Sequence, residues 1–450
     1  MLSSIRNLSK STFNYRNRIN RNMKIAIEGC CHNTLEVIYQ TIDYIEKQKK
    51  IKIDLLLICG DFQSIRNSAD LDSLNVPQKY RTLGNFHKYY SGELKAHCPT
   101  LFIGGNHEAS NYLWELYHGG WVCDNIYYLG CAGVVNFGGL RIGGLGGIYN
   151  DRDYYTGHHE KMPYSQQTIR SIYHLKQYDV VKLMQIKKPL DIFMSHDWPL
   201  GITSHGDEKE LLRIKPFFKN DILTNKLGSP PGEKLLSKLK PKFWFSAHLH
   251  VKFTAVVYHD DSEDKSNSVK TLSIYENPDE ISMESNESEN EKDPVMLGDD
   301  KIDDKIDDVS FTQFLALDKC LPGRDFLQIL DFPEANGSPE FNYDEEWLAI
   351  TRATHDFLSL QYKELPIPCE EEISERIKKE RQWVLENISD FHIPKNFQPT
   401  APSDSSLSSE QKFKYDLRQP FLNPQTIAFT NMLKIENKIN PDGQTIVVED

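Results

Sequence analysis

Short apolar segments recur along the first part of the chain, and a turn of small and polar residues follows each of them. They are Lys24–Glu28, Ile53–Cys59, Thr100–Ile103, Ile126–Leu129, Gly139–Ile142, Asp191–Ser195 and Phe243–Ala247. Between some of them, apolar residues recur at helical spacing, as in Thr34–Lys47 and Gln78–Tyr90. Near-continuous apolar strands that alternate with helices are typical of parallel sheets covered on both faces. The sequence therefore predicts an α/β sandwich of β-sheets flanked by helices.

Five of these predicted strands are followed by loops that carry metal-ligand side chains. The loops are Cys30-Cys31-His32, Gly60-Asp61, Asn106-His107, Ser195-His196-Asp197 and His248-Leu249-His250. In α/β sheets the carboxyl ends of the strands form the usual binding site. Nitrogen, thiolate and carboxylate ligands suit zinc, iron and manganese, and a carboxylate such as Asp61 can bridge two cations. Singly, each loop is an ordinary turn; their joint occurrence predicts a binuclear centre acting on a phosphoryl group.

Charge is distributed unevenly along the chain, whose formal net charge is −13. Residues 259–309 hold 18 acids against 5 lysines, which leaves 47 of the 65 acids and 47 of the 52 bases elsewhere. Alternating charge with few aromatics predicts a disordered acidic insertion there. The neutral remainder shows that the overall pI does not exclude a nucleic-acid partner.

The two ends of the chain differ in character. Residues 1–22 are basic, lack acids and are expected to form a disordered extension, a mitochondrial transit peptide being the alternative. The segments Phe311–Leu317 and Phe326–Phe332 are expected to pair as a hairpin around Pro322-Gly323, in one sheet with Phe253–Tyr258. Helices follow at Asp344–Leu358 and Glu371–Ile388, so a smaller, mostly helical region is predicted over 310–450.

No apolar run is long enough to span a membrane, and no secretory signal is apparent. The eight cysteines are scattered, and Cys30 and Cys31 are adjacent, which does not indicate a disulfide framework. A reducing intracellular compartment is therefore expected.

The ordered set of loops resembles the calcineurin-like metallophosphoesterase superfamily, whose first motif is usually Asp-x-His. Here that motif is Cys30-Cys31-His32, and this departure matches the RNA lariat debranching enzymes. Further segments resemble the same family: Cys59–Gln63, Val76–Arg81, Phe102–Asn111 (FIGGNHEASN), Thr168–His174 (TIRSIYH), Ser195–Pro199 (SHDWP), Trp244–Phe253 (WFSAHLHVKF), Phe311–Asp331 and Tyr343–Asp356. The resemblance covers most of Met23–Asp450, with a catalytic domain over 23–258 and a debranching-enzyme C-terminal region over 310–450.

The resemblance implies hydrolysis of the 2′-5′ phosphodiester at the branch point of excised intron lariats. One metal would be held by Cys30, His32, Asp61 and His250, and the other by Asp61, Asn106, His196 and His248. A metal-bound hydroxide would attack, and His107 would protonate the departing 2′-oxygen. The Cys30 thiolate favours Fe(2+) and Zn(2+), with Mn(2+) as a further candidate.

The insertion at about 146–176 corresponds to the family's lariat recognition loop. Aromatic faces and Arg can hold unstacked bases, which makes Tyr154, Tyr155, Tyr164 and Arg170 candidate contacts to branched RNA. The resemblance also implies a nuclear enzyme that could shuttle to the cytoplasm, a monomer, and protein partners among the factors that release introns from the spliceosome.

Two other classes of function compete with this interpretation. A protein phosphatase or DNA nuclease of the same superfamily would share the metals, but should have Asp at position 30 and lack the insertion. A catalytically dead relative that only binds RNA or the spliceosome is the second alternative. The presence of all seven ligand candidates and His107 argues against it.

Overall fold

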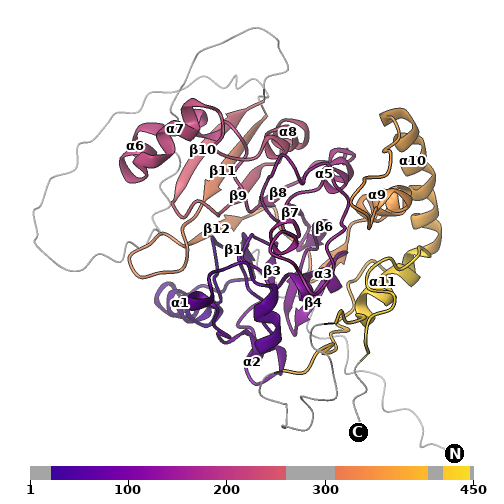
Figure 1. Ribbon diagram of the computed structural model, residues 1–450. Coiled ribbons are helices and arrows are strands. Elements are labelled where there is room, and N and C mark those ends of the chain that lie inside the picture. Colours follow the sequence, from indigo (N-terminus) through magenta and orange to yellow (C-terminus); the bar gives the residue numbers. More distant parts are fainter. Residues whose placement is uncertain (1–21, 260–309, 404–418, 446–450) are drawn as a thin grey trace, which may run out of the picture.

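The structure is a computed structural model that describes residues 22–259, 310–403 and 419–445. Its centre consists of two β-sheets (Figure 1). The first has the strand order β12-β1-β2-β3-β5-β4 and the second β10-β11-β9-β8-β7-β6-β13. The strands of the first sheet are β1 Met23–Glu28, β2 Leu55–Ile58, β3 Thr100–Phe102, β4 Gly120–Cys123, β5 Ile126–Tyr128 and β12 Leu327–Phe332. Those of the second are β6 Ala132–Phe137, β7 Leu140–Leu145, β8 Ile192–Ser195, β9 Phe243–Ser246, β10 Phe253–Tyr258, β11 Phe311–Ala316 and β13 Phe341–Tyr343.

The apolar strands form the core because both of their faces are covered. Strands β1, β2, β3 and β5 pair in parallel, as do β7, β8, β9 and β11. Side chains from both sheets, such as Leu57, Leu101, Met194 and Phe245, share one buried cluster. Burial on both faces explains why these strands have continuous rather than alternating apolar sequences. The predicted α/β sandwich is confirmed.

Helices cover the outer faces of the sandwich. The helix α1 (Leu35–Lys49) packs its apolar side chains with those of β2 and β3, and the short α2 (Phe86–Tyr90) and α3 (Ser110–Glu115) join the same cluster. On the second sheet, α5 (Gln177–Met184) and α8 (Pro230–Leu239) contribute to another cluster. Two shorter helices on that side are α6 (Glu208–Ile214) and α7 (Lys219–Leu223), and a further short helix, α4 (Thr168–Ser171), lies in the segment between β7 and α5.

The expected helix over 78–90 is wrong. A 3₁₀ turn, η2 (Gln78–Tyr80), follows Pro77, and α2 begins only at Phe86. Between them Gly84 has a φ of 62°, in the left-handed region that interrupts a right-handed helix. The apolar residues of 78–90 are spaced as in a helix, but the segment forms two short helical elements instead of one continuous helix.

The expected hairpin of Phe311–Leu317 and Phe326–Phe332 is also wrong. The strand β11 lies between β9 and β10, whereas β12 pairs antiparallel with β1 in the other sheet. The connecting segment crosses from one sheet to the other, where Lys319 bridges to Cys30. The alternating pattern and the Pro-Gly turn are compatible with a hairpin, but β12 forms the edge of the first sheet whereas β11 lies inside the second.

The C-terminal region is joined closely to the catalytic domain. Besides β11, β12 and β13, it contains α9 (Glu345–Thr354), α10 (Glu370–Asn387) and α11 (Pro424–Leu433). Arg141 on β7 donates to Asp344, the N-cap of α9, from Nε and Nη2 at 2.7 and 2.8 Å. The helices α9, α10 and α11 share a further buried cluster beside the sandwich (Figure 1).

The predicted basic extension and acidic insertion lie outside the described residues, apart from their last and first residues respectively. Among the described helices, none has the length and apolar character needed to cross a membrane.

Candidate metal centre

All five ligand-bearing loops follow the carboxyl ends of strands β1, β2, β3, β8 and β9. The first three strands are parallel neighbours in one sheet, and the last two are parallel neighbours in the other. Parallel neighbours bring their carboxyl ends to the same edge, which is why residues far apart in sequence meet here.

Cys30, His32, Asp61 and His250 form the first donor group, because one ligand atom of each lies within 4.8 Å of those of the others. The Nε2 atoms of His32 and His250 are 3.1 Å apart, and His32 Nε2 is 3.6 Å from Asp61 Oδ2. Cys30 Sγ accepts a hydrogen bond from the backbone N–H of His248 at 3.2 Å. These are the four residues that the family resemblance implies for the first metal.

The second donor group lies on the other side of Asp61. His196 Nε2 is 3.4 Å from Asp61 Oδ1 and 3.1 Å from Asn106 Oδ1. The rings of His196 and His248 are 5.1 Å apart between centroids. The two carboxylate oxygens of Asp61 thus face different groups of donors, as a bridging ligand requires.

Two glycines permit this close approach of side chains. A Cβ at Gly60 would lie 2.3 Å from His196 Nδ1, and one at Gly105 would lie 2.2 Å from Asp61 Oδ1. The backbone is also held in the left-handed region at ligand residues, with φ of 48° at Asp61 and 62° at His248. Such conformations are costly for non-glycine residues and persist where the surrounding structure imposes them.

Burial and neighbouring charges set the protonation of the donors. Burial lowers the pKa of His196 to about 4 and that of His250 to about 3, which leaves both imidazoles neutral at pH 7. Burial alone would raise the pKa of Asp61, but the neighbouring His196, His32 and His107 lower it overall. Burial, with Asp61 and Glu28, raises the pKa of the Cys30 thiol. A bound cation acts in the opposite direction and deprotonates a coordinating thiol.

The orientation of His196 also fits a metal ligand. Its Nδ1 lies 2.7 Å from the carbonyl oxygen of Cys59, so Nδ1 carries the proton and Nε2 presents a lone pair to the second group. Neutral imidazoles, a central carboxylate, an amide oxygen and one thiol suit divalent ions of the borderline class. The donors present therefore fit two divalent metals.

His107 lies beside both groups without joining the first. Its ring centroid is 5.7 Å from that of His32, and its Nε2 is 3.1 Å from Asn106 Nδ2. Its Nδ1 is 3.1 Å from the carbonyl oxygen of Asn75, which can only accept. Nδ1 is therefore the anchored donor, and Nε2, which accepts from the Asn106 amide nitrogen, is the ring atom that can exchange a proton.

Glu108 connects the loop that carries Asp61 to the loop that carries Asn106 through hydrogen bonds, a role that the sequence did not reveal. Its Oε1 accepts from the backbone N–H groups of Phe62 and Gly105 at 2.8 and 2.9 Å, and its Oε2 accepts from that of Gln63 at 2.8 Å. Burial followed by the charge of Asp61 raises the pKa of Glu108 to about 8. Three donors on two oxygens nevertheless suit the ionised carboxylate, because a protonated oxygen would face an N–H group.

The four recognition-loop candidates occupy different environments. Tyr164 and Arg170 line one open groove. Tyr154 is only 9% exposed and packs in the core cluster of the second sheet, with the 61% exposed Tyr155 against its edge.

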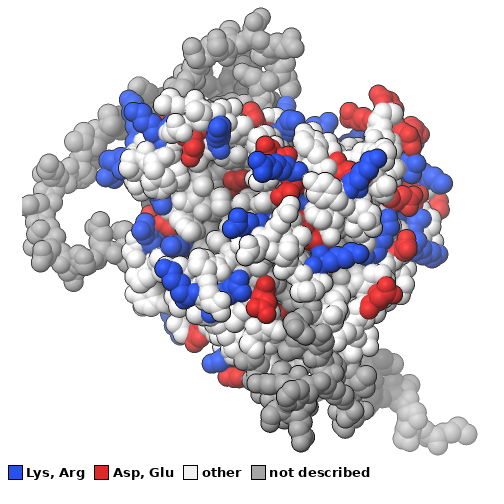
Figure 2. Space-filling model, in the orientation of Figure 1, with Lys and Arg blue, Asp and Glu red and all other residues white. Residues whose placement is uncertain are grey.

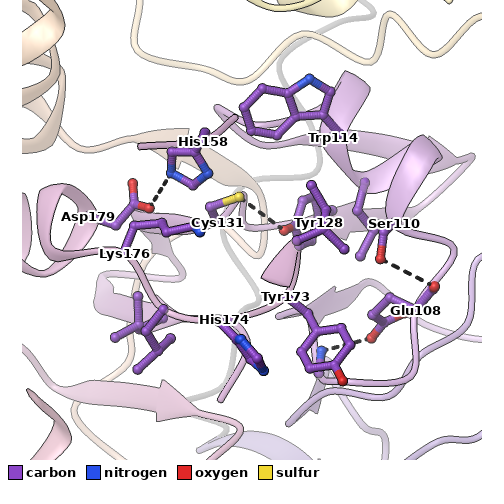
Figure 3. A pocket seen from close by; sticks show the side chains of 18 residues that line it. Glu108, Ser110, Trp114, Tyr128, Cys131, His158, Tyr173, His174, Lys176 and Asp179 are labelled. Carbon is purple, nitrogen blue, oxygen red and sulfur yellow. Dashed lines mark hydrogen bonds and ion pairs between the residues drawn. The ribbon is translucent and has the colours of Figure 1, made fainter. Parts of the chain in front are cut away.

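The base of the recognition loop encloses a cavity of about 50 Å³ behind the Gly104-Gly105 turn. Figure 3 shows Glu108 and Ser110 on one side of it and the bonded pair His158 and Asp179 on another. Lys176 Nζ, on the same loop, donates to Glu160 at 2.9 Å. The first contact joins the loop to α5 of the catalytic domain, and the second holds two parts of the loop together.

The sequence comparisons agree with this geometry. The calcineurin-like phosphoesterase family matches residues 23–252, and the lariat debranching enzyme C-terminal domain matches residues 309–438. The lariat debranching enzyme of Arabidopsis thaliana is 47% identical over 91% of this chain and 86% of its own length. The chain belongs to the lariat debranching enzyme family. It is therefore a metallophosphoesterase, a hydrolase whose family implies divalent metal ions.

Other relatives in the lariat debranching enzyme family are more distant but cover as much of the chain. The enzyme of Schizosaccharomyces pombe is 39% identical over 92% of this chain and 96% of its own length. That of Homo sapiens is 43% identical over 92% of this chain and 69% of its own. Among solved structures, a protein of Thermus thermophilus covers 52% of this chain and 93% of its own at 14% identity, with a TM-score of 0.30.

Proposed function

We propose that this member of the lariat debranching enzyme family hydrolyses the 2′-5′ phosphodiester at the branch point of excised intron RNA. The observation that carries the proposal is the position of Asp61 between two donor groups, with His107 beside them. Two metals held by such a centre could bind one phosphodiester, while His107 could donate a proton to the leaving oxygen. The products would be a linear RNA with a free 2′-hydroxyl and a 5′-phosphate.

Two divalent ions, Fe(2+) and Zn(2+) in our proposal with Mn(2+) as a substitute, would supply a hydroxide nucleophile at neutral pH and would neutralise the phosphate charge. One would be held by Cys30, His32, Asp61 and His250, and the other by Asp61, Asn106, His196 and His248. The donor atoms of the first set already lie within 4.8 Å of one another. The soft sulfur of Cys30 supports iron or zinc over magnesium.

His107 is the proposed proton donor to the departing 2′-oxygen. The Asn75 carbonyl oxygen fixes its Nδ1–H, so the ring presents Nε2 toward the site. The backbone N–H of His107 donates to Asp61 Oδ1 at 2.8 Å, which ties the position of the ring to that of the bridging carboxylate. A general acid fixed in this way contributes to the rate by orientation as well as by proton transfer.

Branched RNA is the proposed substrate, and intron-release factors of the spliceosome are proposed partners. Basic and acidic side chains are interspersed among the described residues on the face shown in Figure 2, rather than gathered in one broad basic patch. This pattern supports recognition near the metals over non-specific binding along a duplex. Because lariats arise from splicing, we propose a nuclear location with shuttling to the cytoplasm.

The test is cleavage of a synthetic branched RNA by anaerobically purified protein loaded with Fe(2+), Zn(2+) or Mn(2+). The expected result is release of a 5′-phosphate end from the 2′-5′ branch, with linear 3′-5′ RNA left intact. A control protein, Asp61→Asn, should lose both metal content and cleavage. Absence of cleavage by every metal-loaded form would overturn the proposal.

A further inference from the structure

An open groove of about 1000 Å³ runs beside the metal centre, between two segments that are distant in sequence. One wall is formed by residues 69–81, which include most of the 3₁₀ helix η1 (Ser68–Ser73). The other is formed by residues 162–173 of the recognition loop. Side chains of the two walls meet where Asn75 Nδ2 donates to the hydroxyl oxygen of Tyr173 at 2.6 Å.

The groove includes the residue that anchors the ring of the proposed proton donor. Asn75 lines the groove, and its carbonyl oxygen is the atom that lies 3.1 Å from His107 Nδ1. A branched RNA whose branch phosphate is at the metals has three arms that must leave the site along the protein surface. A groove that starts at Asn75 offers a path for one of them.

The lining chemistry suits a single-stranded nucleic acid. Arg81 and Arg170 lie on opposite walls, and Tyr164 and Tyr173 line the recognition-loop side. Guanidinium groups bind phosphates with two hydrogen bonds, and aromatic faces stack on bases of any sequence. The one acid in the lining, Asp72, is 3.6 Å from Arg81 at its Oδ1 and has a side chain that is 77% exposed.

The two arginines differ in how firmly their guanidinium groups are held. Arg81 Nε donates to the Val76 carbonyl oxygen at 3.2 Å, which holds the guanidinium on the groove wall. Arg170 is exposed on α4 and makes no ion pair with any of the described residues. One cation is thus fixed in advance, and the other can adjust to the phosphate that it meets.

We infer that this groove binds one single-stranded arm of the branched RNA, with Arg81 and Arg170 at its phosphates and Tyr164 and Tyr173 at its bases. The inference rests on the proposed function. It assigns a substrate role to the 69–81 segment, which lies outside the recognition loop.

The test compares a minimal branched RNA, with one nucleotide on each arm, with three substrates in which a single arm is extended by about six nucleotides. For the unaltered protein, extension of one particular arm is expected to lower KM by about 10-fold, as charge-assisted contacts would predict. In Arg81→Gln and in Arg170→Gln, the ratio of the KM for the minimal substrate to the KM for the extended one should fall from about 10 toward about 1. Arg81→Lys should restore part of it, because a cation remains.

Arg213→Gln is the matched control, since Arg213 is exposed on α6 and pairs with Glu210 rather than lining the groove. It should keep the full advantage of arm extension. An unchanged advantage in both groove variants would overturn the inference and leave the groove to another ligand, such as a protein. Failure of the unaltered protein to cleave any branched RNA would instead overturn the proposed function.

Discussion

The backbone N–H of His107 donates to Oδ1 of Asp61 at 2.8 Å, so the proposed proton donor and the bridging carboxylate share one hydrogen bond. Because the donor is a backbone group, the bond does not depend on the imidazole. Removal of the ring should therefore leave the metal ligands in place.

His107→Ala is expected to retain metal and branched-RNA binding while its turnover falls by at least about 100-fold, the usual contribution of a general acid. Metal content by elemental analysis, RNA binding by titration and single-turnover cleavage measure the three properties separately. A parallel loss of metal and activity would make His107 a ligand. His87→Ala, on α2, serves as the control and should behave like the unaltered protein.

Glu108→Gln should loosen the contact between the Asp61 loop and the Asn106 loop. The new amide group would place N–H donors against backbone N–H donors, which costs about 1–3 kcal/mol for each buried group left unpaired. We expect weaker metal retention on dialysis and a lower Tm, with some activity recovered at high metal concentration. Glu93→Gln, at an exposed position, should change neither property. Normal metal retention in Glu108→Gln would contradict the role assigned to this carboxylate.

Cys30→Asp should alter metal preference rather than abolish metal binding. A carboxylate replaces the soft sulfur with a hard oxygen, so activity with Mn(2+) should rise relative to activity with Zn(2+). Sensitivity to peroxide should also fall, since the thiolate is the oxidisable ligand. Cys369→Ser, at an exposed cysteine, should keep the metal preference of the unaltered protein. The measurement is cleavage by apoprotein reconstituted with each metal, before and after peroxide.

The strand-end loops could be located from sequence because each ligand follows an apolar run, and the fold then brings the carboxyl ends of those runs together. The contact between Asn75 and Tyr173 could not, since it joins residues 98 positions apart and neither residue follows a predicted strand. The predicted pairing of β11 with β12 is wrong for a related reason, because the local alternation of apolar residues does not say which sheet a strand joins. Tyr164 and Arg170 were found by composition, but only the opposite wall, with Arg81, gives them a shared groove.

The contact between Arg141 and Asp344 should make the attachment of the C-terminal region sensitive to acid. Burial alone would raise the pKa of Asp344, but its hydrogen bonds and charge interaction with Arg141 lower it overall. A carboxyl group whose pKa is lower in the folded state stabilises the fold above its unfolded pKa of about 3.9, and this contribution is lost as the pH falls through the folded value. Asp344→Asn leaves the Arg141 guanidinium short of a charge partner and should cost about 3 kcal/mol near neutral pH.

Thermal unfolding of the unaltered protein and of Asp344→Asn, from pH 7 down to pH 3, tests this contribution. The difference in Tm should be largest near pH 7 and should narrow below about pH 4, where the Asp344 carboxyl group begins to bind a proton in the unfolded chain before it does so in the folded protein. Asp442→Asn, at an exposed carboxyl, should give no difference at any pH. A Tm difference that stays constant down to pH 3 would show that Asp344 acts through its N-cap hydrogen bond to Trp347 rather than through its charge.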